Sequence, residues 1–249
     1  MKLSTKLGAL AAFALCTISV PALAEGELYR AKPPPESPQH FELELRFTPY
    51  SPRIDYQAGL RGTPYNDTFG ASYRVLASFE FDWQALRIPH FGTIGPGLSV
   101  GYTSASGSAT YTANGKPSAE STSLEVIPFY GVAVLRVDVF ERDFGVPLVP
   151  YGKVGVGVAL WRASNDSGTS STNGIDGKGT TWGTHFALGL GLSMNWLDRR
   201  AAHSLDGAIG INDTLLFGEW TFMNLDGFGS NDKLLVGMST FTGGLAFAF

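Results

Sequence analysis

The sequence is poor in cysteine and in charge, and each shortage excludes a class of protein. One cysteine, Cys16, occurs in 249 residues, so a fold held together by disulfides is excluded. Only 16% of the residues are charged, and the formal net charge is −4. Because no basic cluster is present to neutralise phosphates, we expect no nucleic-acid partner. The aromatic content of 12% argues against a disordered chain.

The chain also lacks the repeated long apolar runs of a helical membrane protein, and its one such run lies at the N-terminus. Lys2 and Lys6 precede this run, and the small residues Ala22 and Ala24 form a cleavage site behind it. An uncleaved helical anchor is disfavoured, because the run is shorter than the ~20 residues that a span needs. We therefore expect residues 1–24 to be a Sec signal peptide that is cleaved after Ala24 and takes the only cysteine with it.

The rest of the chain divides into a short leader and one long patterned region. Residues 25–40 are rich in proline, which predicts an extended periplasmic lead-in. In residues 41–47 every odd position is apolar and every even position is charged, and this period of two is typical of β-strands. We therefore expect residues 41–249 to form an all-β domain. Similar runs cover residues 75–85, 97–102, 153–160, 185–196 and 240–249.

Two further runs are less regular. In residues 121–138 the apolar side chains change from one set of alternate positions to the other within residues 130–135, which predicts a β-bulge. In residues 204–221 the parity is lost at the adjacent apolar pair 216–217. With these two runs, the count comes to about eight strands.

The connectors between the strands alternate in length. Long connectors cover residues 49–71, 105–120, 163–180 and 222–232, and short ones cover residues 88–92, 140–147 and 198–203. An even number of strands with long loops at one end and short turns at the other is typical of outer-membrane barrels. The sequence therefore predicts a transmembrane up-and-down antiparallel β-barrel with short periplasmic turns and long extracellular loops.

The polar face of the runs decides between a membrane barrel and a soluble barrel such as a lipocalin. It consists largely of Gly, Ser, Ala and Thr, whereas a surface in water normally carries Lys and Glu. The apolar face carries no charge at its centre, as contact with lipid demands. Trp83 and Trp196 lie on this face toward the short turns, and Tyr102 and Trp182 lie on it toward the long loops. These positions predict two aromatic girdles in contact with outer-membrane lipids.

Charged residues on the polar face gather near the periplasmic ends of the strands. An eight-stranded bore is just wide enough for side chains to fill it, and buried charges require partners, so we expect an ion-pair network inside the barrel. This network could act as a charged constriction or gate, or as a structural plug, and the plug is the favoured interpretation. Its expected members are Glu42, Glu44, Arg46, Glu80, Asp82, Arg136, Asp138 and Lys153.

Above the charged layer the lumen positions become small. An open vestibule toward the outside and a tapered, filled barrel both agree with this pattern. We expect Gly189→Ser on the lumen side to be tolerated, whereas Leu190→Arg on the lipid side should block insertion. The small residues are Ser78, Gly101, Thr103, Ala159 and Gly189.

No spacing in the sequence marks a nucleophile, a metal site or a cofactor site. Of the four histidines only His185 is expected high in the lumen, with Glu125 at a similar height. A catalytic role needs a base that a third group orients, and nothing in the sequence indicates one. The acidic loop over residues 165–179 lacks the spaced carboxylates of a Ca²⁺ site. We therefore expect no enzymatic activity, no cofactor and no bound metal.

The C-terminal strand carries Phe241, Leu245, Phe247 and Phe249 on one face, and it resembles the signal that the outer-membrane barrel assembly machinery recognises. More broadly, the chain resembles a family of small outer-membrane β-barrels of myxobacteria and related proteobacteria. The resemblance implies an outer-membrane location and implies no reaction. It rests on residues 49–50, 55, 80–84, 127–128, 136–138, 146–155, 181–183, 205–206, 210–212, 217–219 and 243–245.

These observations favour an integral outer-membrane barrel whose lumen is largely filled by side chains. Its expected role is structural or a surface interaction through the extracellular loops, whose ligand the sequence does not specify. A narrow channel or transporter for small or apolar solutes is the alternative. A lipid-modifying outer-membrane enzyme is less favoured.

Overall fold

The computed structural model describes residues 39–249, apart from residues 111–116, 167, 173–174, 197–209 and 231. The predicted signal peptide with its cleavage residues Ala22 and Ala24, nearly all of the predicted lead-in and the predicted turn over residues 198–203 lie outside the described residues. In the part of the chain that is described, no helix is both long enough and apolar enough to cross a lipid bilayer.

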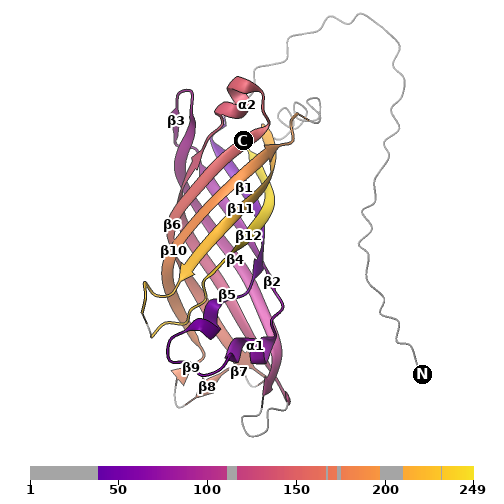
Figure 1. The fold of residues 1–249 in the computed structure, drawn as a ribbon, viewed down its shortest axis with the longest axis vertical. Helices are drawn as coiled ribbons and strands as arrows, with labels where there is room; N and C mark the ends of the chain where they lie inside the picture. The colour runs from indigo at the N-terminus through magenta and orange to yellow at the C-terminus, as the bar shows by residue number, and fades with distance from the viewer. Residues whose placement is uncertain (1–38, 111–116, 167, 173–174, 197–209, 231) are drawn as a thin grey trace, which may run out of the picture. The chain divides into compact units, whose positions relative to one another are not determined.

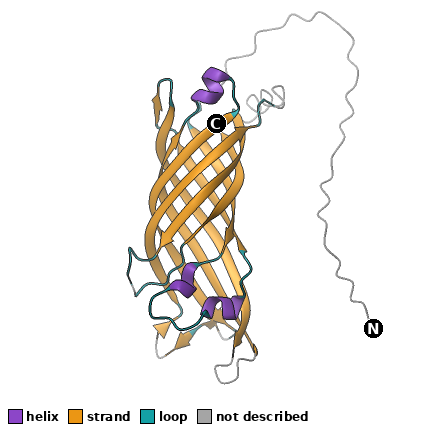
Figure 2. Ribbon diagram, in the orientation of Figure 1, coloured by secondary structure: helices purple, strands orange, loops and turns teal. Residues whose placement is uncertain are grey.

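Eight long strands of the described chain form one closed antiparallel sheet (Figure 2). Each strand pairs with the long strand that follows it in the chain, and β1 pairs with β12 to close the ring. Closure gives every long strand two neighbours and removes the free sheet edges. The predicted all-β, up-and-down antiparallel barrel is confirmed. Its strands are β1 (Phe41–Tyr50), β2 (Arg74–Trp83), β4 (Gly92–Thr110), β5 (Pro117–Arg136), β6 (Leu148–Asn165), β10 (Lys178–Ser193), β11 (Asp213–Leu225) and β12 (Met238–Ala248).

Short elements occupy both ends of the barrel (Figure 1). At one end, here called the short-turn end, β3 (Leu86–Ile88) pairs with the start of β4, and α2 (Val139–Phe144) joins β5 to β6. The C-terminus lies at this end. The opposite end, here called the long-loop end, carries η1 (Arg53–Tyr56), α1 (Pro64–Phe69), β7 (Gly168–Thr169), β8 (Ser171–Thr172) and β9 (Ile175–Asp176).

Two strands differ from the sequence predictions. The pairing of β5 with β6 runs without a break from Arg136 to Thr122, so the predicted bulge is wrong. Strand β11 begins at Asp213 and keeps its parity throughout, with Leu216 facing outward and Phe217 inward. Both errors have one cause, because the lumen wall is itself partly apolar and apolar parity therefore does not always mark the outer face. The connector predicted over residues 105–120 is also largely strand, since β4 and β5 extend into it.

The outer face of the barrel is apolar and exposed. Leu98 on β4 and Leu188 on β10 expose 71% and 73% of their surface. Aromatic side chains lie on this face toward both ends of the strands, and Phe41 contacts Phe81 and the C-terminal Phe249 near the short-turn end. Such a band is what a lipid-facing surface requires. The predicted girdle residues Trp83, Tyr102 and Trp182 and the C-terminal residues Phe241, Leu245, Phe247 and Phe249 belong to this outer face, whereas Trp196 is exposed in the turn after β10.

Loops close the lumen at the long-loop end. Ile54 of η1 and Tyr65 of α1 belong to the same buried apolar cluster as Leu76 and Tyr130 of the barrel wall, and Val236 joins them from the loop before β12. The Tyr50 hydroxyl donates to the Val236 carbonyl at 2.8 Å. These contacts hold the loops against the lumen at the long-loop end. The buried cluster of Ile54, Tyr65, Leu76, Tyr130 and Val236 is here called the apolar plug.

Candidate functional site

Eight charged side chains meet inside the barrel near the short-turn end. Alternate residues of β1 face the lumen, and the register sets Glu42 opposite Asp82 and Glu44 opposite Glu80 on β2. Arg46 follows on β1, and strands β5, β6 and β11 supply Arg136, Lys153 and Glu219. No side chain in the group is more than 7% exposed. The lumen charge cluster consists of Glu42, Glu44, Arg46, Glu80, Asp82, Arg136, Lys153 and Glu219.

Arg136 lies among three of the carboxylates. Its Nη2 donates to Glu42 at 2.5 Å, to Asp82 at 2.8 Å and to Glu44 at 3.0 Å. The oxygens of these three side chains lie within 4.8 Å of one another, which is a spacing that a metal ion could bridge. Because the guanidinium nitrogen already bonds all three, the arrangement is a buried ion-pair centre and gives no support for a metal site.

Arg46 and Lys153 bind the other half of the cluster. Arg46 Nη1 donates to Glu80 at 2.7 Å and to Glu44 at 3.0 Å, and its Nη2 donates to Glu219. Lys153 Nζ donates to Glu44 at 2.6 Å and also to Glu80. Glu44 therefore contacts all three cations and joins the two halves into one network.

The structure brings together seven of the eight charged residues that the sequence analysis singled out, and leaves one apart. Asp138 is not in the cluster, because β5 ends at Arg136 and Asp138 lies at the start of α2. There it pairs with Arg87 at 2.7 Å and with Arg142 at 2.9 Å outside the lumen.

Sequence reasoning missed two members of this layer. Tyr151 of β6 and Glu219 of β11 lie on either side of Gly189 of β10, and the Tyr151 hydroxyl donates to Glu219 Oε2 at 3.0 Å. The sequence pattern places the start of the run that contains Glu219 at residue 204. A strand that begins at Asp213, as β11 does, has its odd positions facing the lumen, and these include Glu219 and Thr221. Tyr151 gave no signal, because a tyrosine beside the short turns is equally typical of an outer girdle.

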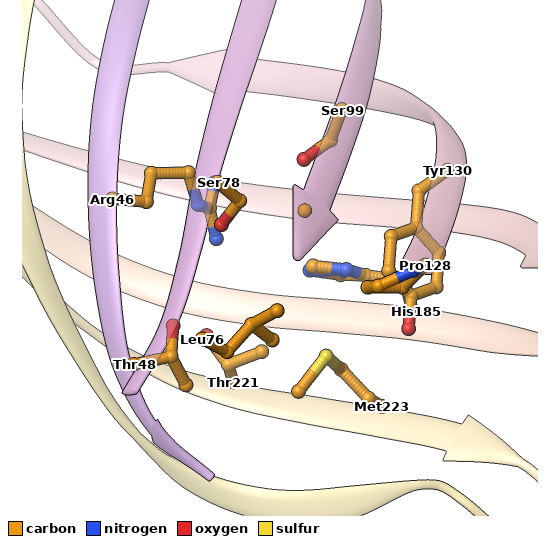
Figure 3. Close-up of a pocket in the computed structure, with 11 residues that line it drawn as sticks. Arg46, Thr48, Leu76, Ser78, Ser99, Pro128, Tyr130, His185, Thr221 and Met223 are labelled. Carbon is orange, nitrogen blue, oxygen red and sulfur yellow. The ribbon is translucent and has the colours of Figure 1, made fainter. Parts of the chain in front are cut away.

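A small cavity lies between the charge cluster and the apolar plug (Figure 3). Its volume is about 20 Å³, and Arg46, Tyr130 and His185 line it together with Ser78, Ser99 and Thr221. A single water needs roughly 10–15 Å³ of such space, so the cavity accommodates one water molecule and no larger solute. Within the described residues, neither ring nitrogen of His185 nor the Tyr130 hydroxyl has a hydrogen-bond partner.

The placement of His185 gives no catalytic arrangement. Its ring makes an edge contact with Tyr130, with the centroids 4.7 Å apart. Glu125, which the sequence placed at a similar height, lies on the outer face and accepts a hydrogen bond from the Tyr102 hydroxyl at 3.2 Å. The barrel wall therefore separates the two side chains.

The small lumen residues make room for tyrosine rings. A Cβ atom on Gly189 would lie 2.3 Å from the Tyr151 ring, and one on Gly157 would lie 2.3 Å from the Tyr130 ring. Among the described residues, tyrosine rings therefore occupy the space beside these glycines, which favours the tapered, filled barrel over the open vestibule. A serine at position 189 would require the Tyr151 ring to shift, so this geometry argues against the expectation that Gly189→Ser is tolerated.

Comparisons with known proteins give similarity of fold alone. No protein-family model and no curated protein matches the chain. Among solved structures, the chain is similar to the outer membrane protein OprG from Pseudomonas aeruginosa, with 12% identity, a TM-score of 0.48 and coverage of 86% of this chain and 97% of that one. It is also similar to Ail, the attachment invasion locus protein of Yersinia pestis, in complex with the heparin analogue sucrose octasulfate. There the identity is 10%, the TM-score 0.42 and the coverage 85% and 97%.

These scores support no argument about role. Charge cluster, water-sized cavity and apolar plug follow one another along the bore. In the part of the barrel that the structure describes, these three features bury the lumen-facing side chains against one another. The link to a myxobacterial family stays a prediction.

Proposed function

We propose that the chain is an integral outer-membrane β-barrel with a closed lumen, which acts through its long-loop end as a structural or surface-interaction protein. The observation that carries this proposal is the division between the two faces of the wall. The outer face exposes large apolar side chains such as Leu98 and Leu188, while the inner face buries eight paired charges. A barrel in water would need the opposite arrangement.

The proposed protein is exported to the outer membrane, has the assembly machinery and lipids as partners, and catalyses no reaction. Residues 1–24 direct export and are removed after Ala24, the assembly machinery inserts the barrel, and lipids surround it. No enzymatic activity is assigned, because within the described residues His185 has no hydrogen-bonded partner to orient it. A transport role for small or apolar solutes is disfavoured, because the cavity beside Arg46 accommodates one water molecule.

Surface labelling tests the location and the orientation together. Arg61 lies exposed at the long-loop end and Arg142 at the short-turn end. In intact cells, a membrane-impermeant maleimide should label an Arg61→Cys variant, and should label Arg142→Cys only after lysis. The reversed pattern would show an inverted barrel, and absence of both variants from the outer-membrane fraction would overturn the proposed location.

Phe249 is expected to promote assembly of the barrel in the outer membrane as part of a terminal signal, in addition to its packing against Phe41. Phe249→Ser should lower the amount of barrel in the outer membrane, because it removes the terminal aromatic of the predicted assembly signal. Phe41→Ser is the matched control, since Phe41 contacts the Phe249 ring from β1, with the centroids 6.1 Å apart. Quantitative immunoblots of membrane fractions should show depletion for Phe249→Ser alone. Equal depletion in both variants would mean that packing, and not a terminal signal, is responsible.

A further inference from the structure

The apolar outer surface continues past the girdle residue Trp83 into the β3 hairpin. Strand β3 pairs with the start of β4, so that Leu86 lies opposite Ile94 and Arg87 opposite Thr93. Ile94 shares the outward parity of Leu98, whereas Thr93 is buried. Leu86, which is 66% exposed, and Ile88 therefore extend the outer face of the barrel, and Arg87 lies on the inner side of the hairpin.

Helix α2 lies at the same end of the barrel (Figure 1) and exposes a second apolar surface. Phe140 and Phe144 are one helical turn apart, with ring centroids at 6.5 Å, and Phe144 is 72% exposed. At 100° per residue, Arg142 lies on the opposite side of this helix. The helix thus has one aromatic side and one charged side, which is the pattern of a helix at a lipid interface.

Ion pairs join the two elements through their charged sides. Arg87 of β3 bonds Asp138 at 2.7 Å, and Asp138 also bonds Arg142 of α2 at 2.9 Å. The His90 ring at the hairpin tip lies 3.8 Å from the Asp143 carboxylate. These contacts pair the charges with one another, while the apolar side chains stay between 40% (Ile88) and 72% (Phe144) exposed. Exposed aromatic and branched apolar groups gathered in this way indicate a contact surface.

We infer that β3 and α2 form an interfacial collar that binds the lipid leaflet at the short-turn end through Leu86, Ile88, Phe140 and Phe144. The inference rests on the proposed membrane barrel. We assign lipid as the partner of this surface because Leu86 and Ile88 continue the outward face that Leu98 presents to the bilayer. Trp83 on the neighbouring strand β2 lies between the level of Leu98 and the level of Leu86. Aromatic residues such as the two phenylalanines of α2 add the type of side chain that settles at the boundary between headgroups and acyl chains.

Spin labels at single cysteines test the collar directly. Cys16, the only cysteine of the sequence, lies in the predicted signal peptide, so the refolded mature chain (residues 25–249) carries no native cysteine and allows one label at a time. The collar is probed by Leu86→Cys and Phe144→Cys, the barrel face by Leu98→Cys, and the charged side of α2 by Arg142→Cys. Each variant is reconstituted in phosphatidylcholine vesicles, and its relaxation by oxygen, which partitions into lipid, is compared with its relaxation by a water-soluble nickel complex.

The collar predicts that oxygen relaxes the labels at positions 86, 98 and 144 more than nickel does, and that this ratio is reversed at position 142. Nickel-dominated relaxation at positions 86 and 144, with position 98 still in lipid, would overturn the collar and leave the barrel proposal intact. Nickel-dominated relaxation at position 98 would overturn the barrel proposal itself. In the unsubstituted chain, nuclear Overhauser effects between acyl-chain protons and the methyl groups of Leu86 and Ile88 give a second measurement that needs no variant. Their absence, while Leu98 shows them, would count against the collar.

Discussion

Replacing Arg136 with methionine is expected to lower the free energy of unfolding of the barrel by about 3–5 kcal/mol, the range for removing one partner from a buried ion pair. The substitution keeps most of the side-chain volume and removes the charge. Glu42, Glu44 and Asp82, which all accept hydrogen bonds from Arg136 Nη2, would be left close together. Denaturant unfolding of the refolded protein in lipid vesicles, followed by tryptophan fluorescence, measures the change.

Arg142→Met provides the matched control for this prediction. Arg142 also pairs with two carboxylates, those of Asp138 and Asp143, but it lies in α2 outside the lumen. Water already solvates these groups, so the control should unfold close to the parent protein. Similar losses in the two variants would mean that the lumen charge cluster is hydrated, and the account of a packed lumen would then fail.

The second large effect is expected on the outer face, where Leu188→Arg should destabilise the membrane-inserted barrel by about 2–4 kcal/mol, the cost of a cation near the bilayer midplane. Leu188 is 73% exposed on the outer face and lies between the girdle residues Trp182 and Trp196 along the same segment. The folded fraction after refolding into vesicles, read from the mobility of unheated samples on gels, measures the loss.

Thr180→Arg on the same strand is the control for the outer face. Thr180 also faces outward but lies beyond Trp182, toward the long-loop end. A cation near the interface costs only about 0–1 kcal/mol, so this variant should refold almost as the parent does. If Thr180→Arg were the more damaging of the two, the position of the bilayer along the barrel would have to be revised.

Local sequence patterns predicted the strands whose two faces differ most in polarity. Residues 41–47 alternate between apolar and charged side chains, so the lumen face of β1 was fixed without reference to its neighbours, and with it the positions of Glu42, Glu44 and Arg46. In β5 the lumen side carries Val126, Tyr130 and Val132, which are as apolar as the outer side. There the faces are set by pairing with β4 and β6, and local periodicity cannot supply that information.

The filling of the lumen depends on contacts between distant residues. Gly189 indicates free space when it is considered alone, but the Tyr151 ring from the neighbouring strand β6 occupies that space. Closure at the long-loop end likewise needs Ile54 and Val236 to meet across 182 positions of the chain. No motif marks either contact, and both follow from the closed ring of strands.

The central claim is that side chains and loops close the bore of a membrane-spanning barrel. Single-channel recording of the refolded protein in a planar bilayer tests it most directly, with gel mobility confirming that the inserted protein is folded. We predict a silent bilayer, because the ion pairs between Arg46, Glu80 and Lys153 and the apolar plug above them leave room for about one water molecule between them. Steady or gated openings from the folded barrel would contradict the claim and would make the lumen charge cluster a selectivity element.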